Sequence, residues 1–322
     1  MSEAISTSVG DLSKLKYGSP DFELAVALRK NAGVYAAFKN HEERGKLVDL
    51  LTDDSGNSKS WNDFRKLAAP LTVLYDKTHL ETEYNQAMAN ASMAKKWNGF
   101  AGNADMYPNL EYRAVMDGHV RAEHAALNGT ILPINDPFWE ANYPPNGWGC
   151  RCSVTQTDKD PVYSDEAKAY TPEPGFDFNP GIDQKLFSDG AGYYQTSNKS
   201  QIEDAAQTLL IRESRNIEKF ADTVSAEGLG EVSISSKGWK EAINQPHPAY
   251  VEKNMALQNL QGLIDSATET KVIGSTKENP MVKQYHALKV EIGDQSSWVL
   301  LREAHDGKLS FYAIVEKLKT EK

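Results

Sequence analysis

Cysteine and long apolar runs are both scarce in this sequence. Its 322 residues include two cysteines, too few for a disulfide framework in a chain of this length. No stretch approaches the roughly 20 apolar residues that a membrane-spanning helix needs. The N-terminus also lacks the basic start and apolar block of a secretory signal. The sequence therefore predicts a protein that is expressed in the cytoplasm and has no membrane partner.

Basic residues are fewer than acidic residues in this sequence. The chain has 35 Lys and Arg against 45 Asp and Glu, a net charge of −10, which argues against a protein that coats nucleic acid through its overall field. The deficit is uneven, because residues 239–322 carry 11 basic and 11 acidic side chains, whereas the preceding part carries 24 and 34. We infer that the two parts of the chain work in different surroundings.

The length predicts at least two domains at roughly 100–200 residues each. Apolar residues recur at spacings of three and four in residues 20–51 and 59–99, which predicts amphipathic helices. Proline, glycine and serine are frequent after residue 157, which indicates a loop or linker. The predicted parts are a mainly helical domain at 1–157, a linker with a connecting helix (Gln201–Val224) at 158–230, and a second domain at 231–322.

After Gly230 the pattern becomes strand-like. A helix is predicted at Tyr250–Ala267, and Gly293-Asp294 and Asp306-Gly307 are typical of hairpin turns. The strand candidates are residues 231–236, 271–275, 284–292, 297–303 and 309–315. We therefore expect an α+β protein: a helical N-terminal domain with an irregular cysteine loop, then a small α+β domain whose sheet has four to five antiparallel strands.

Both cysteines lie in one short stretch, NYPPNGWGCRC at residues 142–152. Thiolates are ligands that suit zinc, and structural zinc takes four ligands in a tetrahedron. His124 is a candidate third ligand beside Cys150 and Cys152. The candidates for a fourth ligand are Asp117, His119 and Asp136.

Other interpretations of the cysteine loop stay open. Cys150 and Cys152 can also be small side chains packed under a turn rich in proline and tryptophan, which is common for free cysteine. A catalytic Cys–His pair is less favoured, because no helix N-terminus follows the thiols. A stand-alone zinc enzyme is weaker still, since the sequence contains no HExxH motif.

The region from Tyr112 to Cys152 resembles the phage Mu F-type minor head protein, or head morphogenesis, family. The residues that carry the resemblance are Arg113, Asp117, Arg121, His124, Ala125, Leu127, Gly129, Pro137-Phe138-Trp139, Pro144-Pro145-Asn146-Gly147-Trp148 and Cys150-Arg151-Cys152. The resemblance extends over roughly residues 20–155. It implies a virion-associated protein of a phage or prophage that acts in head assembly, with portal and capsid proteins as partners.

The C-terminal part offers side chains that suit metal-free RNA cleavage. Histidine titrates near neutral pH and can serve as base or acid, which makes His247 and His286 candidates. Arg302 and Lys253 are candidates for the cation that contacts the phosphate. Simpler interpretations exist: His286 shares strand parity with Leu288 and so can face a core, and Lys253 can be a solvated helix residue.

The order of these motifs resembles the phage-borne branch of the barnase–EndoU–colicin–RelE nuclease superfamily. The matching positions are His247, Lys253-Asn254, Asn279-Pro280, His286 and Arg302. The resemblance implies a metal-independent ribonuclease toxin that needs no cofactor, with RNA as substrate and an immunity protein as partner. The alternative is a catalytically inactive domain that makes protein contacts in the head.

Overall fold

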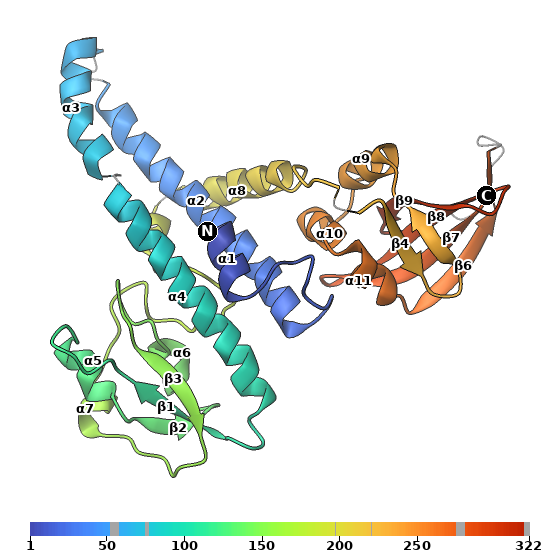
Figure 1. The fold of residues 1–322 in the computed structure, drawn as a ribbon. Coiled ribbons are helices and arrows are strands. Elements are labelled where there is room, and N and C mark those ends of the chain that lie inside the picture. The colour runs from blue at the N-terminus through green and yellow to red at the C-terminus, as the bar shows by residue number, and fades with distance from the viewer. Residues whose placement is uncertain (52–57, 75–76, 197, 220, 275–280, 319–322) are drawn as a thin grey trace. The chain divides into compact units, whose positions relative to one another are not determined.

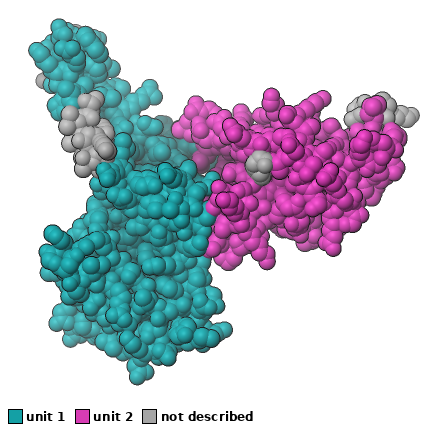
Figure 2. All heavy atoms as spheres, viewed as in Figure 1, with its two compact units in different colours: residues 1–10, 27–207 teal, residues 11–26, 208–322 magenta. Residues whose placement is uncertain are grey.

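The computed structural model describes residues 1–51, 58–74, 77–196, 198–219, 221–274 and 281–318. The chain divides into two compact units (Figures 1 and 2). Unit 1 comprises residues 1–10 and 27–207, and unit 2 comprises residues 11–26 and 208–322. No helix in the described part of the chain is both long enough and apolar enough to cross a membrane.

Helices form the frame of unit 1. They are α1 (Ser2–Ser8), most of α2 (Pro20–Asp49), α3 (Trp61–Leu74) and α4 (Lys77–Gly102). Polar contacts between buried faces fix α2 on α4: Lys39 Nζ lies 2.6 Å from Glu83 Oε2, and the hydroxyl of Tyr35 donates to Glu83 Oε1 at 3.3 Å. Helix α1 is held on α4 by Lys95 Nζ, which donates to the carbonyl of Val9 at 2.8 Å.

A small antiparallel sheet with order β2-β1-β3 follows the helices. Its elements are β1 (Asn109–Arg113), α5 (Ala122–Leu127), β2 (Ile131–Pro133), α6 (Phe138–Asn142), β3 (Ser153–Thr157) and α7 (Asp165–Lys168). Its core is built from aromatic and aliphatic side chains that include Tyr112, Trp139 and Tyr143. The hydroxyl of Tyr143 donates to the carbonyl of Met93 in α4, so the sheet region is anchored to the helical frame.

The segment after β3 is ordered on the helices of unit 1. The Asn31 side chain in α2 accepts from the backbone N–H groups of Leu186 and Phe187, and Asn90 in α4 donates to the carbonyl of Leu186 at 2.6 Å. The rings of Tyr35 and Phe187 stack at 3.8 Å. A 3-10 turn, η1 (Gly192–Tyr194), and helix α8 (Lys199–Glu213) complete this stretch.

Unit 2 contains a six-stranded sheet with order β4-β5-β9-β8-β7-β6. Its elements are β4 (Thr223–Ala226), β5 (Gly230–Ser233), α9 (Ser236–Asn244), α10 (Tyr250–Leu257), α11 (Leu260–Asp265), β6 (Glu269–Gly274), β7 (Val282–Ile292), β8 (Gln295–Ala304) and β9 (Leu309–Val315). Aliphatic residues from the strands and helices share one core with Trp239. The mixed α+β class is confirmed.

The expected number of strands is wrong, and so is the expectation of a wholly antiparallel sheet. Strand β4 takes residues that the pattern assigned to the end of the connecting helix, which stops at Glu213 instead. Strand β5 pairs parallel with β9, with Val232 opposite Leu309. Parallel neighbours are joined by long crossovers, so no local hairpin signal marks this pairing.

One predicted helix is divided in two at Asn259. The Asn259 side chain accepts from the backbone N–H of Gly262, which caps α11, and it donates to the carbonyls of Leu12 and Leu15. A Cβ on Gly262 would lie 2.6 Å from Asn259 Oδ1, so glycine is required at this cap. The cap explains the break, and it ties residues 11–26 into unit 2.

Candidate metal centre

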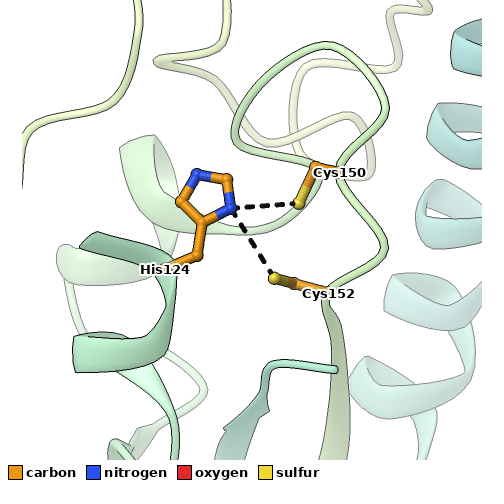
Figure 3. A group of neighbouring side chains, drawn as sticks. All are labelled: His124, Cys150 and Cys152. Atoms are coloured by element: carbon orange, nitrogen blue, oxygen red, sulfur yellow. Dashed lines mark hydrogen bonds between the residues drawn. The ribbon is translucent and has the colours of Figure 1, made fainter. Parts of the chain in front are cut away.

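Three soft metal-ligand groups converge in unit 1, as predicted for His124, Cys150 and Cys152 (Figure 3). The Nδ1 atom of His124 lies 3.7 Å from Cys150 Sγ and 3.8 Å from Cys152 Sγ. The three ligand atoms all lie within 4.8 Å of one another. His124 and Cys152 are buried, at 3% and 9% exposed. The imidazole presents Nδ1 rather than Nε2 to both sulfurs.

Local structure places His124 beside the thiols. His124 lies in α5, whose end is fixed to the end of β1 because Asn128 Oδ1 accepts from the N–H of Ala114 at 3.0 Å. The chain then turns into β2 at Gly129, whose φ of +82° favours glycine. Strand β3 begins directly after Cys152 and pairs with β1. Strand β1 therefore anchors both the helix that carries His124 and the segment that carries the thiols.

Hydrogen bonds shape the cysteine loop itself. Asn146 is fully buried, and its Oδ1 accepts from the hydroxyl of Tyr112 in β1 at 2.6 Å. Arg121 Nη2 donates to the carbonyl of Trp148 at 2.8 Å. Gly149 has a φ of +68°, which allows the turn that delivers Cys150. These contacts fix the loop from both ends.

Charge and burial set the protonation of the two thiols. The pKa of the Cys150 thiol is lowered to about 4, first by its hydrogen bond with Cys152 and then by that with His124. The hydrogen bond to Cys150 and burial raise the pKa of Cys152. Cys150 is thus the more acidic of the two thiols. A metal that binds both sulfurs as thiolates displaces the protons that they carry.

Neither candidate carboxylate joins the cluster. Asp117 accepts two hydrogen bonds from Arg151, at 2.7 and 2.8 Å, and this pairing lowers the pKa of Asp117 to about 2. Asp136 Oδ1 accepts from the N–H of Phe138 at the start of α6. Among the described residues, the group with metal-ligand spacing consists of His124 and the two cysteines. The sequence did not predict the pairing of Arg151 with Asp117, because the two residues are 34 positions apart.

A small pocket of about 30 Å³ adjoins the cluster. Its lining residues are Val115, His119, Val120, Arg121, His124, Gly149, Cys150, Arg151 and Cys152. His119 is exposed and lies in the turn after Asp117, whose Oδ1 accepts from the His119 N–H at 2.9 Å. His119, the remaining candidate for the fourth ligand, therefore lines the same pocket as His124, Cys150 and Cys152.

In unit 2, His247 and Lys253 make internal contacts. His247 Nε2 lies 3.0 Å from Ser297 Oγ, and its Nδ1 accepts from the N–H of Ala249. Burial lowers the pKa of His247, so the neutral imidazole engages both nitrogens. Lys253 is fully buried, and its Nζ contacts the backbone carbonyls of Ala242, Ile243 and Gln245 at the end of α9.

His286 and Arg302 lie on β7 and β8. His286 is 6% exposed, and its Nε2 lies 2.7 Å from Glu303 Oε2. Arg302 stacks on the ring of Tyr312 at 3.5 Å and lies 3.6 Å from Glu241. Successive strand residues point to opposite faces, so Arg302 points away from the face on which Glu303 meets His286. The sequence did not predict that Glu303 contacts His286. The contact depends on the register between β7 and β8, which a single strand does not reveal.

The four candidates for RNA cleavage are spread over separate places in unit 2. His247 contacts Ser297, whereas His286 pairs across the sheet with Leu301. These β8 positions are four residues apart, roughly 13 Å along a strand. Asn279 and Pro280 lie outside the described residues.

Comparison with known proteins gives two matches. Residues 46–155 match the family described as Phage Mu protein F like protein, and residues 198–312 match large polyvalent protein-associated domain 3. The first region agrees with the head morphogenesis resemblance. The second match does not confirm the ribonuclease resemblance, which stays a prediction. No solved structure matches the chain.

Two curated relatives are similar to about a third of the chain. The chain is 38% identical over 105 residues to the putative capsid assembly protein F of Escherichia phage Mu, covering 33% of this chain and 21% of that protein. It is 38% identical over 102 residues to the Mu-like prophage FluMu F protein of Haemophilus influenzae, covering 32% and 22%. The chain thus spans about a fifth of the length of these relatives. About a third of this protein is therefore similar to the F proteins of phage Mu and of a Mu-like prophage, and the cysteine loop lies in the region that matches the Mu F-like family.

Proposed function

We propose that this protein acts in the assembly of a phage or prophage head and becomes part of the virion. The observation that carries the proposal is the 38% identity over 105 residues to a putative capsid assembly protein, together with the match of residues 46–155, which include His124 and both cysteines, to the Mu F-like family. Portal and capsid proteins are the partners that this role implies. The proposal concerns unit 1, because the matched residues 46–155 lie within it.

The geometry of unit 1 supports a structural role for this region. Sites for organic ligands typically enclose about 300–1,000 Å³, whereas the pocket at the cysteine loop holds about 30 Å³. Its ionic neighbours Asp117 and Arg151 are engaged with each other. Large aromatic side chains such as Trp139 and Tyr143 are fully buried in the scaffold. The region is thus built to hold a shape, which is what a contact surface in an assembly requires.

Loss of the protein is expected to block head assembly. An early stop codon in the reading frame, introduced into the phage or prophage that carries it, should lower the titre of infectious particles, because a head that lacks an assembly protein is not completed. Electron microscopy of lysates should show absent or aberrant heads, and the protein should be found in purified wild-type virions. A synonymous codon change at the same position is the control. Normal heads and titre without the protein would contradict the proposal.

For unit 2, the second candidate function is ribonuclease activity. The observation that favours it is His286: its Nε2 meets the Glu303 carboxylate, while its buried Nδ1 has no hydrogen-bond partner among the described residues. Buried polar atoms without partners are uncommon and call for an explanation. An imidazole oriented by a carboxylate is one part of a general base, and RNA would reach the buried Nδ1 only after neighbouring side chains move. His247 and Lys253 are engaged internally and contribute less to this candidate.

Ribonuclease activity would depend on His286. Full-length protein incubated with total RNA is expected to cleave it, and His286→Ala should lower the rate by about 10²–10⁴, the usual contribution of a general base. His305→Ala is the matched control, because His305 is an exposed histidine of the same unit. Intact RNA with the wild-type protein would favour the other role of unit 2, an inactive domain that makes protein contacts.

A further inference from the structure

We propose that unit 1 contains a structural zinc site in which His124, Cys150 and Cys152 are ligands and His119 supplies the fourth. The inference is independent of the role in head assembly. The first argument is distance. Zinc–sulfur and zinc–nitrogen bonds of about 2.3 and 2.0–2.1 Å at a tetrahedral angle place sulfur and nitrogen roughly 3.6 Å apart. The observed separations from His124 Nδ1 are 3.7 and 3.8 Å.

The second argument is the donor set. Two thiols and an imidazole nitrogen suit zinc and exclude magnesium and calcium, which prefer oxygen ligands. Thiols two positions apart on a chain that enters a strand point to the same side. Here that side faces His124, whose Nδ1 lies near both sulfurs (Figure 3). The spacing of the cysteines and the position of the histidine together therefore place three donors around one point.

The third argument concerns the open side of the cluster. The pocket of about 30 Å³ touches His124 and both cysteines, and it is large enough for one water-sized group. His119 is on its wall, and its exposed side chain belongs to a turn of the chain. Of the remaining candidates, Asp117 is paired with Arg151, and Asp136 Oδ1 accepts from the N–H of Phe138. A Cys₂His₂ site therefore forms when the His119 imidazole turns into the pocket.

The salt bridge beside the site has a positioning role in this arrangement. Arg151 lies between the two cysteines in sequence, and Asp117 lies two residues before His119. Their bidentate contact joins the loop that carries the thiols to the turn that carries His119. The backbone N–H of His119 also donates to Asp117. The pair thus keeps the fourth ligand close to the other three without binding the metal itself.

Metal analysis of the full-length protein tests the site. Protein purified without chelator or affinity-tag histidines is expected to contain about one zinc per chain, and Cys150→Ser, Cys152→Ser and His124→Ala should each lose it. His41→Ala is the control, because His41 is an exposed histidine on α2 of the same unit. Less than about half an equivalent in the wild-type protein, after incubation with zinc and removal of excess, would overturn the site.

Cobalt substitution tests the fourth ligand. Co²⁺ bound to the wild-type protein should show the intense visible absorption of a tetrahedral site with two thiolates. His119→Ala should retain the sulfur-to-cobalt charge-transfer band, change the visible bands, and weaken metal binding at least about tenfold. A His119→Ala spectrum and affinity identical to those of the wild type would overturn the assignment of His119. Neither measurement depends on the activity of the protein in head assembly.

Discussion

Cys152→Ser is expected to lower the melting temperature of unit 1 by roughly 8–16 °C in the presence of zinc. A ligand that binds the folded state alone at a thousand times its Kd stabilises that state by about 4 kcal/mol. Each kcal/mol shifts the melting temperature by about 2–4 °C in a domain of 150–250 residues, and unit 1 has about 190. Serine is nearly isosteric with cysteine, so the loss reports the missing thiolate rather than a cavity.

Calorimetry of the full-length protein with and without chelator separates metal loss from poor packing. Chelator should lower the melting temperature of the wild-type protein to that of Cys152→Ser and leave the variant unchanged. Cys150→Ser should behave like Cys152→Ser, although Cys150 is less buried. A wild-type melting temperature that chelator does not move would contradict a stabilising metal.

The metal cluster shows what the sequence can predict about a site. Cys150 and Cys152 are two positions apart, and His124 lies 26 residues before Cys150. Their residue types, which suit zinc, were sufficient to select the three. The ion pair that Asp117 makes could not be predicted from residue types. Its partner Arg151 is 34 residues away, and only the folded loop brings the two charges together.

In the sheet of unit 2, strands joined by tight turns could be predicted from the sequence, whereas pairing between distant segments could not. Strands β7, β8 and β9 follow one another through tight turns and alternate in polarity, so their predicted positions agree with the structure within a few residues. Strand β4 has four residues, too few for a clear period. The parallel pairing of β5 with β9 joins segments separated by α9, α10, α11 and by β6, β7 and β8, and local pattern contains no information about it.

His286 illustrates why parity alone leaves two interpretations. Its shared face with Leu288 predicts that it points into the core, and the structure does bury it. Glu303 lies on the facing strand at a position that only the register between β7 and β8 identifies. A buried histidine beside a carboxylate is chemically different from one among leucines, and single-strand patterns cannot separate the two.

Lys253→Met is expected to destabilise unit 2 by about 2–4 kcal/mol at neutral pH, since buried carbonyls that lose their donor cost about 1–3 kcal/mol each. The hydroxyl of Tyr250 also donates to the carbonyl of Ile243. The unsatisfied acceptors in Lys253→Met are therefore the carbonyls of Ala242 and Gln245. Lys240→Met is the matched control, because it removes the same charge from an exposed position on α9. Urea unfolding followed by tryptophan fluorescence measures both, and equal stability of the two variants would contradict a structural role for Lys253.

The pH dependence of the same variant provides a second signature. Burial, with a smaller contribution from the charge of Arg215, lowers the pKa of Lys253 to about 7, whereas an unfolded lysine has a pKa of about 10.4. Between these values the unfolded chain binds more protons than the folded chain, so the contribution of Lys253 makes the free energy of unfolding rise with pH. Below pH 7 both states are charged and the slope disappears. The difference in unfolding free energy between wild type and Lys253→Met should therefore grow from pH 7 to pH 9, and a constant difference would show that Lys253 keeps its proton in the folded protein.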